Sequence, residues 1–359
     1  MGCLHKVFNK LVNPYIKINE NQEIENEEIE SEENGSEENG NEENNENEEN
    51  IEKREEENYR LYDNFNISSN QIICKIKLKK NNIRSLCVLD DGRLVSGSFE
   101  GKIIIYNKIT YKPDKIIKKF KGEIKLLKLN SNRLAIYHSS NNIILCKIKK
   151  NKCKIFQTLN YHTSSVYYLT KLNNNNLVSS SLDNSIIFYS KNKNKYTKYY
   201  QIDTNSLCMS ITQINDNELC YSKLIKFPNY KINFYDFNER KEKASISNID
   251  SISNVLEMIT KDILIVFGLN KLSLINVNKH ILVRIIINTE WAFGFCKLNE
   301  NMFLTGSGDG IISQWKIEDD NIALIHRKEK AHEKAIFTLI KIGKGIISSG
   351  SVDGTIKFW

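Results

Sequence analysis

Serine, histidine and aspartate recur in this chain at matching intervals. His162 precedes Ser179 by 17 residues and Asp183 by 21, and His332 precedes Ser349 and Asp353 by the same intervals. These are the residue types of an acyl-transfer triad, in which histidine takes the proton of a serine hydroxyl. They are also the residue types of buried hydrogen-bond relays that only stabilise a fold. Whether these residues form a catalytic triad or a structural relay depends on the secondary-structure elements that position them.

Other signatures of chemistry are missing from the sequence. It contains no G-x-x-x-x-G-K-[ST], no H-E-x-x-H and no G-x-S-x-G in a strand–turn–helix context. His138, His280 and His326 have no partners at ligand spacing, and the eight cysteines form no C-x-x-C pair. This cysteine usage predicts reduced core thiols in a cytoplasmic protein. We expect no catalytic residue, no metal site and no cofactor.

The elements that carry the serines and aspartates form a repeat of about forty residues. Six-residue segments rich in β-branched and aromatic residues recur seven times, 40, 43, 46, 40, 40 and 44 residues apart. Their last residues are Tyr106, Cys146, Tyr189, Tyr235, Ile275, Trp315 and Trp359. This period and the alternating pattern are typical of a propeller with four-stranded blades.

Each repeat also contains two apolar residues five positions apart, beginning with Leu89 and Leu94. Asn, Asp and Gly between them favour a tight hairpin turn. The fourth repeat has four extra residues within 222–230. The seventh repeat ends at its third strand and so lacks a fourth strand of its own. Segment 71–78 (QIICKIKL) has strand character and belongs to none of the seven repeats. We expect it to pair with the last blade and close the ring, which removes exposed strand edges.

Four segments resemble the WD-repeat family: VSGSFEGKIIIY (95–106), SSSLDNSIIFY (179–189), TGSGDGIISQW (305–315) and SSGSVDGTIKFW (348–359). The resemblance covers about 71–359 and implies an all-β, seven-bladed propeller. It also implies a structural relay in each well-matched blade, from a turn Asp through a loop His to a strand Ser or Thr and an aromatic residue. The implied members are His332, Asp353, Ser349 and Trp359; His162, Asp183, Ser179 and Tyr189; and Asp309, Thr305 and Trp315. On this interpretation the sets are structural, not catalytic.

The resemblance further implies a partner-binding face, made by the turns before each third strand and the loops before each first strand. Its expected members are Phe99, Leu182, Phe227, Glu290, Trp291, Lys334 and Val352. Trp291 has two interpretations, either an interface anchor or a residue packed in the blade core. The insertion in the fourth repeat is either a basic, aromatic clamp for an acidic peptide or an ordinary surface loop.

The charge of the chain is strongly divided. Residues 20–57 contain 19 Glu and two basic residues, a net charge of −17, whereas residues 58–359 carry +21. Such a segment cannot offset the entropy of ordering, so 19–58 are predicted to be a disordered acidic linker. Residues 1–18 form a basic amphipathic segment. Gly2 and Cys3 resemble the myristoylation and S-acylation sites of dually acylated peripheral membrane proteins.

These features predict a non-catalytic, monomeric protein-interaction scaffold or adaptor that binds a protein or peptide. We expect it in the cytoplasm, at the cytosolic face of a membrane if Gly2 and Cys3 are acylated. The alternative is a soluble WD-repeat adaptor or nucleic-acid-associated propeller with an unmodified N-terminus. The positive charge of 58–359 suits an acidic partner. It is carried mostly by Lys, with little Arg for bidentate contacts, so nucleic acid is the less expected partner.

Overall fold

The computed structural model describes residues 65–69, 71–78, 81–138, 140–150, 152–226, 229–250, 255–268, 270–287, 289–318, 321–343 and 345–359. The chain divides into two units, 1–55 and 56–359, and the second holds everything described below. The expected anchor at 1–18, with Gly2 and Cys3, and the expected linker at 19–58 lie outside the described residues. So does Phe227.

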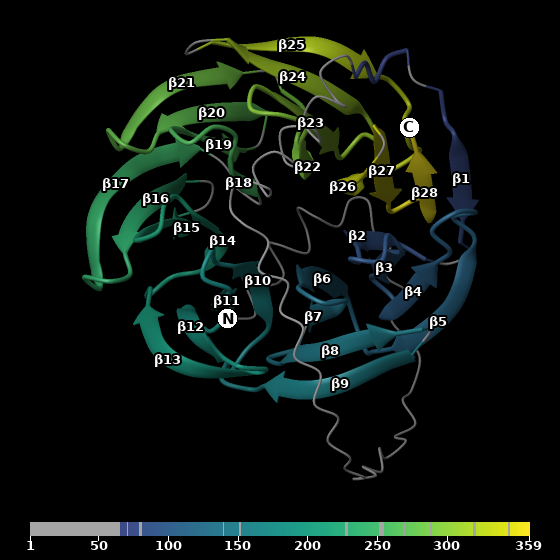
Figure 1. Cartoon of the computed structure of the whole chain (residues 1–359). Helices are drawn as coiled ribbons and strands as arrows, with labels where there is room; N and C mark the ends of the chain where they lie inside the picture. Colours follow the sequence, from purple (N-terminus) through teal and green to yellow (C-terminus); the bar gives the residue numbers. More distant parts are fainter. Residues whose placement is uncertain are drawn as a thin grey trace, which may run out of the picture. The chain divides into compact units, whose positions relative to one another are not determined.

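The described residues form seven four-stranded antiparallel sheets (Figure 1). Blade one holds β2 (Ile83–Val88), β3 (Leu94–Ser98), β4 (Lys102–Tyr106) and β5 (Pro113–Lys119); blade two holds β6 (Ile124–Leu129), β7 (Arg133–His138), β8 (Ile143–Lys149) and β9 (Lys152–Leu159). Blade three holds β10 (Val166–Lys171), β11 (Leu177–Ser181), β12 (Ser185–Asn192) and β13 (Lys195–Asp203); blade four holds β14 (Cys208–Gln213), β15 (Glu218–Lys226), β16 (Asn229–Asp236) and β17 (Lys241–Asp250).

Blade five holds β18 (Val255–Met258), β19 (Ile263–Phe267), β20 (Lys271–Asn276) and β21 (Ile281–Ile287); blade six holds β22 (Ala292–Lys297), β23 (Met302–Ser307), β24 (Ile312–Glu318) and β25 (Asn321–Lys328). Blade seven holds β26 (Ile336–Gly343), β27 (Ile346–Ser351), β28 (Thr355–Phe358) and β1 (Cys74–Lys77), which comes from the other end of the chain. The seven recurring segments of the sequence are the third strands. No helix in the described ranges is long and apolar enough to cross a bilayer.

The hairpins form where the paired apolar residues flank polar turns. In the first, third and sixth blades the backbone N–H of Leu89, Leu172 and Leu298 donates to the carbonyl four residues later. In the third-blade turn Asn175 has a φ of 63°. Asparagine tolerates this left-handed conformation better than most residues, which explains the asparagine-rich turn NNNN.

The blades are arranged as a closed ring (Figure 1). The first strand of each blade contacts the first strands of its neighbours, in the order β2, β6, β10, β14, β18, β22, β26 and back to β2. Seven hydrophobic clusters fill the described ring, one between each pair of neighbouring blades. The seven sheets confirm the prediction of an all-β, seven-bladed propeller. They form a ring because a blade buries its apolar faces only against its neighbours.

The ring closes through segment 71–78, the one expected to pair with the last blade. Strand β1 lies antiparallel to β28, with Cys74 opposite Phe358 and Lys77 opposite Thr355. Ile76 is buried and belongs to the cluster between the seventh and first blades. The seventh sheet therefore has four strands, and its outer strand comes from the opposite end of the described chain.

A short segment before β1 packs between the sixth and seventh blades, and nothing in the sequence indicated it. Phe65 and Ile67 are buried in the cluster that contains Trp359. The side-chain amide of Gln314, itself fully buried, donates to the carbonyl of Phe65 at 2.6 Å and accepts from the N–H of Ile67 at 3.0 Å. Ser68 exchanges hydrogen bonds with the backbone of Arg327. We call residues 65–69 the strap.

The four extra residues of the fourth repeat lengthen a hairpin. Strands β15 and β16 pair from Glu218 opposite Asp236 to Lys226 opposite Asn229, beyond the ends of the equivalent strands. Ile225 is exposed near the tip, and Phe227 in the tip lies outside the described residues. Whether this hairpin is a clamp stays a prediction.

Candidate partner-binding face and the buried blade networks

The seventh blade contains a continuous hydrogen-bond network. The indole Nε1 of Trp359 donates to Ser349 Oγ at 2.8 Å, and Ser349 Oγ lies 2.7 Å from His332 Nε2. His332 Nδ1 lies 3.1 Å from Asp353 Oδ2. Thr355 donates to Asp353 Oδ1 from its backbone N–H and its hydroxyl. The order is the one that the resemblance implied.

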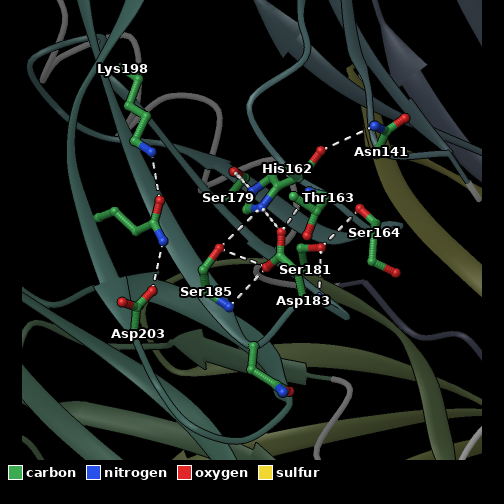
Figure 2. Close-up of polar contacts among 12 residues, drawn as sticks. Asn141, His162, Thr163, Ser164, Ser179, Ser181, Asp183, Ser185, Lys198 and Asp203 are labelled. Carbon is green, nitrogen blue, oxygen red and sulfur yellow. Dashed lines mark hydrogen bonds and ion pairs between the residues drawn. The ribbon is translucent and has the colours of Figure 1, made fainter. Parts of the chain in front are cut away.

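The third blade repeats this network with tyrosine in place of tryptophan, and Figure 2 shows its histidine, aspartate and serines. His162 Nε2 lies 2.7 Å from Ser179 Oγ, and His162 Nδ1 lies 2.9 Å from Asp183 Oδ2. Ser179 Oγ is 3.1 Å from the hydroxyl of Tyr189, and Ser185 takes the place of the threonine. Asp183 thus joins the loop before the first strand to the turn before the third.

Hydrogen bonds stabilise the aspartate charges in these networks. Burial by itself would raise the pKa of Asp353, but hydrogen bonds from His332 and Thr355 hold it well below its usual value. The same balance between burial and hydrogen bonds, led by that from His162, lowers the pKa of Asp183. Burial lowers the pKa of His332 against the opposing effect of Asp353. At neutral pH Asp353 is therefore ionised and His332 neutral.

This protonation state fixes the direction of the hydrogen bonds from Trp359 through Ser349 and His332 to Asp353. A neutral His332 with its proton on Nδ1 donates to Asp353 and accepts the Ser349 hydroxyl proton on Nε2, while Ser349 Oγ accepts from Trp359. Ser179 and Ser349 are both 0% exposed. A substrate carbonyl cannot approach a fully buried hydroxyl that is already hydrogen-bonded on both sides. The two sets therefore stabilise the blades, and the geometry does not favour an acyl-transfer triad.

The sixth blade carries only half of the expected network. Trp315 Nε1 donates to Thr305 Oγ1 at 2.9 Å, as its counterpart does in the seventh blade. The inclusion of Asp309 was wrong. Its side chain is exposed, and within the described residues it makes no hydrogen bond to Thr305 or Trp315. The physical reason is that the sequence has Asn288, not histidine, at the position that would link them.

The expected members of the partner-binding face that the structure describes lie at one end of the ring, where the first strands begin. The N–H of Phe99 donates to Asn82 O, that of Leu182 to Ser165 O and that of Val352 to Ala335 O. Each bond ties the turn before a third strand to the segment before a first strand. Phe99, Leu182 and Val352 are partly buried, and Lys334 is exposed. These side chains therefore border one surface.

Glu290 and Trp291 lie at the same end but have partners within the protein. Glu290 forms a 2.7 Å ion pair with Arg327, so it is less available to a ligand than its sequence position suggested. Trp291 is partly buried against Phe293, with ring centroids 4.7 Å apart. Its Nε1 is buried without an acceptor in the described residues. Trp291 therefore packs against Phe293, and its role as an interface anchor stays a prediction.

Sequence analysis missed the residues that line the inner side of this face. Phe293, Phe337 and Arg84 are the second residues of β22, β26 and β2, at or beside register shifts in those strands. The rings of Phe293 and Phe337 stack at 4.7 Å, and the Arg84 guanidinium lies 3.9 Å from the Phe337 ring centre. The sequence signal for these residues is an aromatic or cationic side chain at the second position of several first strands. A bulge at that position disturbs the alternation of the strand, so the pattern does not show which face of the sheet each side chain occupies.

The family model described as WD domain, G-beta repeat matches residues 153–190, which run from β9 into β12. No curated protein matches the chain. A chain of the solved structure called Crystal Structure of Mitotic Checkpoint Complex is similar, with a TM-score of 0.69, 12% identity, and coverage of 80% of this chain and 94% of that one. The WD40 beta propeller domain of Doa1 is similar with a TM-score of 0.67, 14% identity, and coverage of 80% and 96%. The chain therefore folds as a seven-bladed β-propeller and contains a segment, residues 153–190, that the WD-domain family model recognises.

Proposed function

We propose that this protein is a protein-interaction scaffold that binds a partner polypeptide across the end of the ring where the first strands begin. The observation that carries the proposal is the aromatic run formed by Trp291, Phe293 and Phe337, which are all partly exposed and which join the sixth blade to the seventh. Aromatic side chains of this kind dominate the energetic centres of protein interfaces. The buried serines argue against hydrolysis as the purpose of the blades.

The comparisons support the same class of function. One similar structure belongs to a complex, by its printed name, and the other is described only as a propeller domain. Propellers of this kind generally bind other proteins and do not catalyse reactions. In this chain the networks that stabilise the blades are buried.

A capture experiment with two substituted proteins tests the proposal. The full chain, a face variant (Leu182→Arg with Lys334→Glu) and a control with Asn174→Arg, in an exposed turn at the opposite end of the ring, are immobilised in parallel. Proteins retained from extract of the source cells are compared by mass spectrometry. We expect the face variant to lose specific partners that the control retains. Equal retention by all three proteins would contradict a partner-binding role for this face.

We propose further that the scaffold is tethered to the cytosolic face of a membrane through Gly2 and Cys3. The support is the sequence MGCLHK together with basic, amphipathic residues up to position 18. Two acyl chains hold a protein at a bilayer where one does not. The mass of the native N-terminal peptide tests this, together with membrane fractionation of Gly2→Ala and Cys3→Ser variants. A free or acetylated terminus would favour the soluble adaptor.

A further inference from the structure

Arg84 is a buried cation without a counter-ion in the described residues. It is 6% exposed, and its Nε atom has no hydrogen-bond acceptor. No carboxylate of the described residues lies within 4.0 Å of its guanidinium. Glu123 and Glu100 influence Arg84 only from a distance, and Glu100 already accepts from the N–H of Asn82.

Such an arrangement costs free energy that the fold alone does not recover. A charge taken out of water needs a partner, and arginine cannot avoid this cost by releasing its proton. Lys125 adds a second cation nearby. Burial, and also the charge of Arg84, lower the pKa of Lys125. The buried Arg84 and the partly buried Lys125 together create a positive potential at one end of the ring, which Glu123 opposes from a distance and an anion would neutralise.

Aromatic rings hold the guanidinium in place. Its central carbon lies 3.9 Å from the ring centre of Phe337 and 5.1 Å from that of Phe99. The aromatic run continues from Phe337 through Phe293 to Trp291. A guanidinium over aromatic rings keeps its N–H donors in its own plane, where a carboxylate can accept two of them. We call Arg84, Phe99, Phe337, Phe293 and Trp291 the Arg84 cluster.

Unsatisfied polar atoms are concentrated around this cluster. Among the described residues, eight buried side-chain nitrogen or oxygen atoms have no hydrogen-bond partner. Five of them lie just before or within the starts of β2 and β22, on Asn81, Asn82, Arg84, Thr289 and Trp291. Buried polar groups are almost always paired, so a local excess of unpaired ones indicates a place where a ligand supplies the partners. Arg84 Nε and Trp291 Nε1 need an acceptor such as a carboxylate or carbonyl oxygen, whereas the Asn81 and Asn82 oxygens need a donor such as a backbone N–H of a bound peptide.

We propose that the Arg84 cluster binds an acidic side chain of a partner polypeptide. The Asp or Glu carboxylate pairs with the Arg84 guanidinium, an apolar residue beside it packs on Phe293 and Phe337, and a backbone carbonyl accepts from Trp291 Nε1. The site has one deeply buried arginine, aromatic rings and one neutral donor. That suits a single carboxylate on a peptide better than a chain of phosphates, which requires several accessible cations. The inference rests on the proposed function, because it names the chemistry of that partner.

The first test needs no ligand. In the full chain, Arg84→Met replaces a buried unpaired charge by an apolar side chain of similar length. We expect the melting temperature to rise by about 2–4 °C, since replacing a poorly compensated buried charge stabilises proteins. Arg93→Met is the control, because Arg93 forms an ion pair with Asp91 at the turn after β2. A lower melting temperature for Arg84→Met would assign Arg84 a structural role and overturn the proposal.

The second test measures the ligand. Random linear peptides are displayed and selected on the full chain, and enriched peptides are synthesised with each acidic residue either kept or changed to its amide. We expect enriched peptides to combine Asp or Glu with an apolar neighbour. One amide change, and separately Arg84→Lys or Arg84→Met, should each weaken binding about tenfold or more. Arg93→Met should leave the affinity unchanged.

Three results would contradict the proposal, and they are distinguishable from one another. Peptides that lose affinity on Lys334→Glu but not on either Arg84 variant would refute the inference and leave the scaffold function standing. A single-stranded oligonucleotide whose binding Arg84→Met abolishes, with no acidic peptide enriched, would replace the peptide by a nucleic acid. A library without any binder would count against peptide binding by the whole face, and the inference would fall with the proposed function.

Discussion

The side-chain amide of Gln314 donates a 2.6 Å hydrogen bond to the carbonyl of Phe65, a residue 249 positions earlier in the chain. With the bond from the N–H of Ile67, it replaces the strand pairing that the strap backbone lacks. The strap is thus joined to the third strand of the sixth blade by a side chain that mimics a peptide group.

Replacing Gln314 by Leu should therefore destabilise the propeller. The substitution keeps the size of the side chain but removes the hydrogen bonds that Gln314 makes with the Ile67 N–H and the Phe65 carbonyl, at a cost of about 2–4 kcal/mol in the free energy of unfolding. Urea unfolding followed by tryptophan fluorescence measures the loss. Gln201→Leu, on an exposed outer strand, serves as the control. Equal stability of the two variants would mean that the strap does not contribute.

The aspartates at equivalent turns should differ in their effect on stability. Asp353→Ala removes the acceptor of His332, Thr355 and the Glu333 N–H, so we expect a loss of about 2 kcal/mol or more. Asp309→Ala, at the matching exposed position of the sixth blade, should change stability by less than about 0.5 kcal/mol. Melting temperatures of the two variants give the comparison. Asn229→Ala, at the aligned position of the fourth repeat, should also cost less than Asp353→Ala.

Ring closure predicts a position-dependent response in β1. Ile76→Asp places a carboxylate in the apolar cluster that it shares with Phe358, and it should unfold or open the seam, with aggregation through the exposed edge of β28. Ile73→Asp changes a residue that is 60% exposed and should be tolerated. Size-exclusion chromatography and thermal melting distinguish these outcomes. A monomeric, stable Ile76→Asp protein would show that β1 is dispensable.

Glu257 makes stability depend on pH in a predictable direction. Burial raises the pKa of this carboxyl from 4.5 to about 7 in the folded state. Between these values the folded protein holds a proton that the unfolded chain has lost, so this group's contribution to stability falls as pH rises from about 4.5 to 7. Glu257→Gln should be equally stable at about pH 4 and more stable at about pH 8, by up to roughly 3 kcal/mol.

The matched control for this pH dependence is Glu239→Gln, an exposed carboxylate paired with Lys241. The networks act in the opposite sense, because the lowered pKa values of Asp353 and His332 remove stability as pH falls. The difference in the free energy of unfolding between the parent and Glu257→Gln therefore reports the effect of the Glu257 carboxyl alone. A constant difference from about pH 4 to 8 would contradict its raised pKa.

The strand order and the relays were predictable because their signals are local. Alternation, paired apolar residues and turn asparagines each act within a dozen residues, and the forty-residue period then sets the number of blades. Asp183 and His162 could be assigned to one network because the four-stranded blade places residues at this fixed sequence spacing next to each other. Asp309 was misassigned on the likeness of its turn to those of the third and seventh repeats, although the sequence has Asn288 at the position of the linking histidine.

The pairing of β1 with β28 had a strand signal of its own, but two other contacts between blades left no trace in the local pattern. The strap could not be recognised from the sequence, because Gln314 has the pattern of an ordinary strand residue. Its partner Phe65 lies 249 positions earlier, and only the folded ring places the two side by side. The Arg84 cluster escaped for a related reason. Its rings come from three blades, and bulges turn those side chains away from the facing that simple alternation assigns. Local repetition therefore determined the blades, whereas only the closed ring brought together an unpaired arginine and the aromatic side chains around it.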